Sequence, residues 1–130
     1  MRFVIDKAER QNDMTLVTGK TSVGTIKGIW KYRELPVIND SYHIELKIDH
    51  PCERRIPQGA QAIPYVCLEK EQVIFQGVCE DIDEEVYYIR LDTDWLEMLE
   101  INTVDSNKKI GDLISFSASV YGIGIFPYTL

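Results

Sequence analysis

The sequence contains little cysteine and histidine, which limits the metal and nucleophile chemistry that it can support. Cys52, Cys67 and Cys79 form an odd set with no Cys-x-x-Cys pair, a pattern typical of reduced thiols in a cytoplasm rather than of a disulfide framework. The two histidines, His43 and His50, do not combine with them at the spacing of zinc ligands. We therefore expect no metal site, no cofactor and no catalytic cysteine or histidine.

Long apolar runs are also missing from the sequence. No segment approaches the roughly 20 consecutive apolar residues of a membrane span. The first residues, "MRFVIDKAERQND", contain scattered charges instead of the apolar run of a signal peptide. The sequence thus predicts neither insertion nor export, and we expect a cytoplasmic protein. Because 130 residues are the usual size of one domain, we expect residues 1–130 to fold as a single unit.

No catalytic motif is complete. Gly19, Lys20 and Thr21 match the end of the phosphate-binding pattern G-x-x-x-x-G-K-[ST], but Met14 occupies the position of the first glycine. The residues that follow also make a poor helix start, so the N–H groups that hold phosphates are missing, and the segment predicts a hairpin turn. The sequence has no G-x-S-x-G nucleophile motif either. We name no catalytic residue and favour a protein that is not an enzyme.

What the sequence does contain is a succession of β-strand patterns. In residues 42–49, "YHIELKID", apolar and polar side chains alternate without an error, which indicates a strand with one buried face. Residues 25–32, "TIKGIWKY", alternate less regularly, and seven further segments are rich in β-branched or aromatic residues. These patterns predict an all-β, mainly antiparallel, single-domain barrel or sandwich of about eight short strands. A Greek-key barrel like the oligonucleotide-binding (OB) fold is among the candidates.

Two segments interrupt the strand pattern. Residues 93–100, "TDWLEMLE", fit a short helix that Thr93 or Asp94 would cap, although Trp95 and Leu99 also fit a period of two. We predict at most one short helix in the chain, at this position, with a strand as the alternative. The segment near 50–65 carries prolines at 51, 57 and 64, which break helices and strand ladders. It predicts a long loop.

Negative charge is concentrated in one fifth of the chain. The formal net charge is −7, and residues 80–105 hold ten Asp or Glu against one Lys or Arg. Phosphate binding needs the opposite sign of charge. We therefore expect neither nucleic acid nor a membrane as the partner of this region.

The densest acidic stretch is "GVCEDIDEEVYY", residues 77–88. Asp81, Asp83 and Glu85 follow the alternate spacing of a calcium loop, but Val86 stands where such a loop needs glycine, and strand patterns flank the segment. A β-hairpin with carboxylates in water is the favoured interpretation, because exposed charge also discourages edge-to-edge pairing of strands.

The leading functional hypothesis is a small acidic binding protein, an inhibitor or bacterial immunity protein that neutralises a basic partner such as a nuclease toxin. In such inhibitors, carboxylates take the place of substrate phosphates and speed association. Trp95 and Met98 would anchor the interface if they are exposed, with a core position as the alternative for Trp95. The residues predicted to contact the partner are Glu80, Asp81, Asp83, Glu84, Glu85, Asp92, Asp94, Trp95, Glu97 and Glu100.

Two other hypotheses stay open. Loops on rigid β-scaffolds commonly carry sites, so the protein is alternatively a small-ligand-binding barrel or an enzyme with its site under residues 51–64. The apolar end of the sequence, "VYGIGIFPYTL", points instead to a subunit of a larger assembly, in which another chain covers the last strand.

Overall fold

The computed structural model describes residues 1–104 and 107–128, and their regular structure is almost entirely β-strand. The eleven strands of the described residues exceed the eight expected, and the all-β, mainly antiparallel prediction is confirmed. The strands are β1 (Arg2–Gln11), β2 (Met14–Thr21), β3 (Gly24–Trp30), β4 (Ser41–Ile48), β5 (Cys52–Arg54), β6 (Tyr65–Glu69), β7 (Gln72–Asp83), β8 (Val86–Asp92), β9 (Trp95–Glu100), β10 (Leu113–Ser119) and β11 (Ile123–Tyr128), with two short 3-10 helices, η1 (Ile101–Thr103) and η2 (Val120–Gly122).

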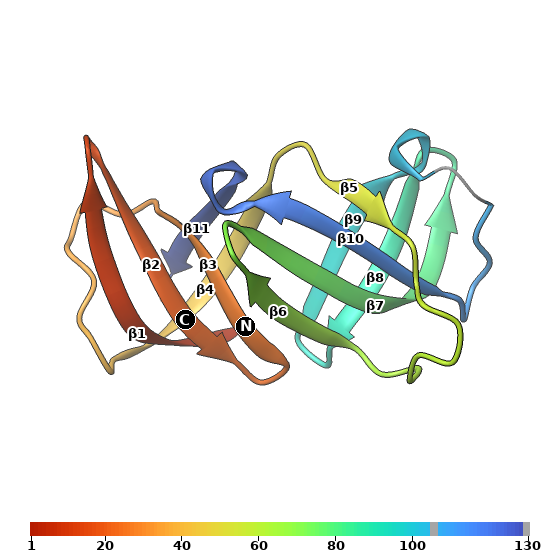
Figure 1. Ribbon diagram of the computed structural model, residues 1–130, viewed down its shortest axis with the longest axis horizontal. Coiled ribbons are helices and arrows are strands. Elements are labelled where there is room, and N and C mark those ends of the chain that lie inside the picture. The colour runs from red at the N-terminus through yellow and green to blue at the C-terminus, as the bar shows by residue number, and fades with distance from the viewer. Residues whose placement is uncertain (105–106, 129–130) are drawn as a thin grey trace.

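Five strands close into a barrel, which lies at the left of Figure 1. Antiparallel pairs join β1 to β2, β2 to β3, β11 to β4 and β4 to β1, and a parallel pair between β3 and β11 completes the ring. Numbered within the barrel alone, the strand order is 1-2-3-5-4. This connectivity is that of an OB-like Greek-key barrel.

Alternation along the strands decides which side chains fill the barrel. In β4, Ile44 is buried whereas His43 and Glu45 are exposed, as period two predicts. The apolar last strand is likewise part of the barrel, with Ile123 and Ile125 fully buried. Ile123 and Ile125 therefore pack inside the barrel, whereas Phe126 and Tyr128 of the same strand remain exposed.

The strands from β5 to β10 form a second lobe, which is inserted in the sequence between β4 and β11 of the barrel (Figure 1). Its central strand is β7, which pairs with β6, β10 and β8, while β5 pairs with β10 and β9 pairs with β8. The ring of Phe75 stacks on Phe116 at 4.9 Å between centroids and meets Trp95 edge-on at 6.2 Å. Three large aromatic side chains thus fill the space between these strands.

Residues 93–100 do not form the predicted helix, and the strand alternative is correct. Strand β9 pairs with β8 along its whole length. Trp95 and Leu99 are buried, whereas Leu96 and Met98 between them are exposed. Helix propensity is a weak preference, and here cross-strand pairing together with burial of alternate side chains decides the conformation.

The segment near 50–65 and the segment that ends in Gly-Lys-Thr both connect neighbouring strands. Within the segment near 50–65, residues 52–54 pair with β10 as β5, residues 55–64 form a loop, and β6 begins at Tyr65. The side-chain amide of Gln76 donates to the carbonyl oxygens of Gln61 and Ile63 at 3.3 and 3.0 Å, which fixes this loop on β7. Thr21 pairs with Gly24 across a tight turn, so the segment that ends in Gly-Lys-Thr lies in a hairpin.

The two lobes join where β3 begins. Gly24 pairs with Val66 of β6, and the N–H of Val66 donates to the carbonyl of Val23 at 3.0 Å. Gly24 has φ 142°, and a Cβ atom there would lie 1.8 Å from the carbonyl oxygen of Val66. Only glycine permits this approach, and the buried side chains of both lobes form one continuous cluster.

We expect Gly24→Ala to lower the free energy of unfolding by roughly 3 kcal/mol or more, because displacement of the Val66 carbonyl adds to strain at positive φ. Gly59→Ala is the matched control: φ is also positive, at 83°, but no atom lies within 4 Å of the added Cβ. Its expected loss is about 1 kcal/mol. Urea denaturation measures both values, and equal losses would contradict a steric requirement at the junction.

Candidate functional site

The acidic stretch at residues 77–88 forms the predicted hairpin. Asp83, the last residue of β7, pairs with Val86, the first residue of β8, across the turn at Glu84 and Glu85. The N–H of Ile82 donates to Asp81 Oδ1 at 2.8 Å, and the N–H of Glu84 donates to Asp83 Oδ1 at 2.7 Å. Short acidic side chains therefore hold the turn backbone, and all of these carboxylates are exposed.

Glu80 differs from its acidic neighbours because it is paired within the chain. The register between β7 and β8 shifts between Cys79 and Asp81, which leaves Glu80 as the extra residue of a β-bulge. Arg90 Nε donates to Glu80 Oε1 at 3.2 Å, and Arg90 Nη2 donates to Glu80 Oε2 at 2.8 Å. This two-bond ion pair neutralises the charge of Glu80 and holds β7 against β8.

The outer surface of β7, β8 and β9 combines carboxylates with apolar side chains. Residues directly opposite each other on antiparallel strands share one face of the sheet. One such row contains Asp83, Val86 and Glu100, and the next contains Asp81, Tyr88 and Met98. Met98 is 67% exposed. We call the surface formed by these six residues the acidic face: an apolar centre at Val86, Tyr88 and Met98 with carboxylates around it.

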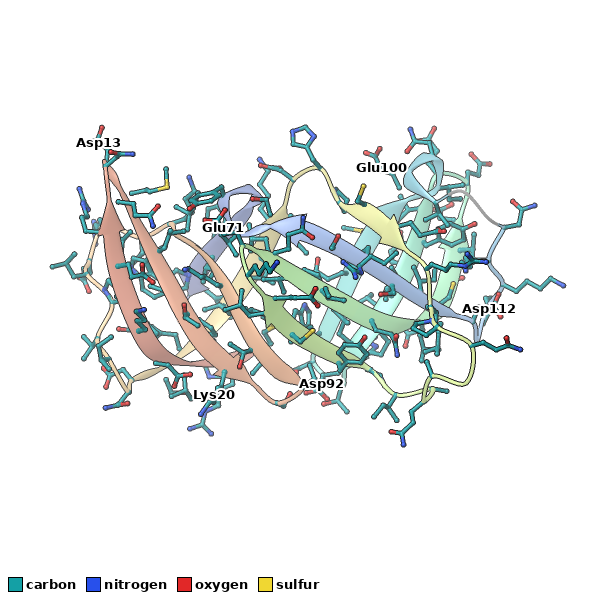
Figure 2. All side chains as sticks on the ribbon, in the orientation of Figure 1. Asp13, Lys20, Glu71, Asp92, Glu100 and Asp112 are labelled. Atoms are coloured by element: carbon teal, nitrogen blue, oxygen red, sulfur yellow. The ribbon has the colours of Figure 1, made fainter. Side chains whose placement is uncertain are left out.

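Two of the predicted contact residues lie away from the acidic face. Asp92 and Asp94 stand at the opposite end of β8, roughly 20 Å from Val86 along a seven-residue strand. Figure 2 shows Asp92 and Glu100 at these two ends. Asp92 accepts hydrogen bonds from the hydroxyl of Ser22 and the N–H of Thr93, which lower the pKa of its carboxyl, and it thereby contacts the β2–β3 turn of the barrel.

Trp95, which the sequence left open between an interface and a core position, belongs to the core. It is 4% exposed, and its indole Nε1–H donates to Glu97 Oε1 at 2.8 Å. Of the two residues predicted to anchor an interface if exposed, Met98 is exposed and Trp95 is buried. The ten predicted contact residues therefore form no single surface: Asp81, Asp83 and Glu100 belong to the acidic face, with Glu84 and Glu85 at the adjoining turn.

Glu97 lies on the inner side of β9, opposite Ile89 of β8, and is only partly exposed. Burial raises the pKa of its carboxyl to about 7; the hydrogen bond from Trp95 opposes this shift, and the negative charge of Glu45 on β4 adds to it. Glu97 is consequently close to half-protonated at neutral pH. It is a half-buried titratable group and differs in this from the exposed carboxylates of the hairpin turn.

Val86, Tyr88 and Glu45 are site residues that were not predicted from the sequence. The signal for the first two was present, because alternation in "VYYIRL" places Val86, Tyr88 and Arg90 on one face. Glu45 gave no signal, since it belongs to a barrel strand that only the tertiary structure brings near β9.

Other site classes receive no support from the part of the chain that the structure describes. Within residues 1–104 and 107–128, no three His, Cys, Asp or Glu side chains gather in a way that would hold a metal ion. No helix of the same residues is long and apolar enough to cross a membrane. The chain matches no protein-family model, no curated protein and no solved structure in the three comparisons.

We expect Glu97→Gln to change how stability depends on pH. Between about pH 4.5 and 7 the unfolded chain has released the Glu97 proton and the folded protein keeps it, so this group's contribution to stability falls as pH rises. Glutamine keeps an oxygen for the Trp95 N–H but has no proton to lose. The variant should therefore gain, relative to the natural protein, up to about 3 kcal/mol in the free energy of unfolding from pH 4.5 to 8.

Chemical denaturation at several pH values measures this effect. Glu84→Gln, at the exposed turn, is the control and should follow the pH profile of the natural protein. A Glu97→Gln profile parallel to that of the natural protein would show that the carboxyl ionises normally.

Proposed function

We propose that this chain is a small acidic binding protein whose acidic face docks on a basic partner protein. The observation that carries the proposal is the division of charge between the lobes. The barrel segments, residues 1–48 and 123–130, contain eight Lys or Arg and six Asp or Glu, whereas residues 49–122 contain six and fifteen. The second lobe alone accounts for the acidity of the chain.

The composition of the acidic face supports this role. Interfaces are commonly built from an apolar centre with a polar rim, and their energetically dominant residues are often aromatic and central. Tyr88 and the exposed Met98 lie on the same face as Asp81, Asp83 and Glu100. The apolar pair would supply contact area, and the carboxylates would attract a positive partner and fix its orientation.

The class of partner follows from the sign of the charge. A protein that binds nucleic acid presents a positive surface, and carboxylates on an inhibitor replace the phosphates of its substrate. We accordingly propose an inhibitor or immunity protein, acting in the bacterial cytoplasm, that neutralises a basic partner such as a nuclease toxin. The ion pair of Glu80 with Arg90 lies on the same side of the sheet, next to the acidic face, and joins β7 to β8 there.

A tagged pull-down from the native host, at low and at high salt, identifies the partner by mass spectrometry. We expect a basic protein in stoichiometric amount, retained more weakly as salt rises, because screening weakens attraction between exposed charges. The double variant Asp83→Lys and Glu84→Lys should then slow association at low salt by about tenfold or more, with little change in melting temperature. Stopped-flow mixing measures the rate.

The matched control reverses two exposed carboxylates of the barrel, Asp6→Lys and Asp13→Lys. It changes the net charge by the same amount at a distance from the acidic face; Figure 2 shows Asp13 at the tip of the β1–β2 hairpin. Equal slowing by both double variants would show that the net charge of the protein, and not the acidic face, controls the association rate. No slowing by either would exclude the acidic face as the docking surface.

A further inference from the structure

A cleft of about 540 Å³ separates the barrel from β9. Its barrel wall contains Glu45 and Leu46 of β4 and Tyr128 of β11, and its second wall is formed by residues 94–98. Leu96 and Met98 are exposed there, at 38% and 67%. The volume is in the range of sites that hold a drug-sized group, and junctions between lobes are common places for such sites.

The charges in this cleft are mainly negative. Glu45 of β4, Asp94 of the β8–β9 turn and Glu97 of β9 contribute carboxyl groups. Arg90 also lines the cleft, but Glu80 neutralises its guanidinium through the two-bond ion pair. The ammonium of Met1 donates to the carbonyl of Ile44 at 3.2 Å and faces the hydroxyl of Tyr128 at 3.5 Å. The cleft therefore contains three carboxyl groups, of which Glu97 has a raised pKa, beside the ammonium of Met1.

The backbone of β9 adds a second feature to the cleft. Consecutive residues from Asp94 to Met98 line it, so the strand meets the cleft along its edge as well as through its side chains. Among the described residues, β9 pairs with β8 alone. An open strand edge offers N–H and C=O groups to an added extended segment.

We propose that the cleft between β4 and β9 captures a lysine or arginine side chain carried by an extended segment of the basic partner. The segment lies along the open edge of β9, its apolar residues contact Leu96 and Met98, and its cationic group enters between Glu45 and Glu97. This inference rests on the proposed function, because the cleft would be a specific attachment point for the same basic partner. It lies beside the acidic face.

Cation entry is coupled to a proton. Glu97 is about half-protonated near pH 7, and a positive group beside it favours the ionised form. The other charged or titratable groups that line the cleft are Glu45 and the hydroxyl of Tyr128 on the barrel wall, the ammonium of Met1, and Asp94 and Arg90 on the same side as Glu97. When the cation enters, Glu97 releases its proton to solvent and pairs with the new charge, so binding strengthens as pH rises from 6 to 8.

The test uses a synthetic peptide, which keeps it separate from the identity of the partner. The probe is an acetylated and amidated hexapeptide of alternating valine and threonine with one central arginine, and its control carries citrulline, the neutral isostere, at the same position. Isothermal titration calorimetry should give at least tenfold tighter binding of the arginine peptide at pH 8. Affinity for it should rise about fivefold from pH 6 to 8.

Three variants locate the site. Glu45→Gln and Glu97→Gln should each weaken binding of the arginine peptide at least fivefold, and Glu97→Gln should also abolish the pH dependence. Glu45 is exposed on β4, so its variant tests the cleft without disturbing the core. The hairpin variant Asp83→Lys and Glu84→Lys should bind the peptide like the natural protein.

The possible failures are distinguishable. Equal binding of the arginine and citrulline peptides, or no binding of either, would overturn cation capture in the cleft. The pull-down would still test whether the protein has a basic partner. If the host extract yields no basic partner but the arginine peptide binds as expected, the cleft is a cation site and the proposed partner is wrong.

Discussion

Both lobes depend on the close approach of other backbones to strand β3. At Gly24 the strand meets Val66 of β6, and at Gly28 it meets β11, where an added Cβ would lie 2.6 Å from the carbonyl oxygen of Ile123. The first contact attaches the second lobe, and the second lies beside the parallel pair that closes the barrel. Because side chains at these two positions would force the backbones apart, two glycines of one strand determine how the barrel closes and where the acidic lobe begins.

The position of the second lobe follows from this arrangement. It lies between the fourth and fifth strands of an OB-like barrel, a connection that carries ligand contacts in proteins of this fold, although fold by itself does not define function. The barrel supplies a nearly neutral scaffold, and the inserted strands supply the acidity. The insertion also turns β9 toward β4 and so creates the cleft. Attachment at β3 thus fixes the relative position of the surfaces on which the functional proposals rest.

The carboxylates of the second lobe are physically unequal. Those at the hairpin turn are exposed and available for long-range attraction, which screening by salt weakens. Glu80 is neutralised by Arg90, Asp92 is held by Ser22 and Thr93, and Glu97 has a raised pKa because it is buried. Environment therefore divides a chemically uniform acidic segment into exposed, paired and titratable groups.

The sequence by itself determined most of the strands, because alternation of apolar and polar residues is local: it predicted the buried face of β4 and the hairpin between β7 and β8. It also located the concentration of negative charge. Only the tertiary structure decided that residues 95–100 form a strand, since pairing with β8 and burial of Trp95 and Leu99 outweigh a weak helix preference. The tertiary structure likewise decided which carboxylates share a face. It also placed Glu45 near Glu97, where the charge of Glu45 helps to raise the pKa of the Glu97 carboxyl. Those relations depend on register and on contacts between distant segments, and neither quantity is present in a local pattern of residues.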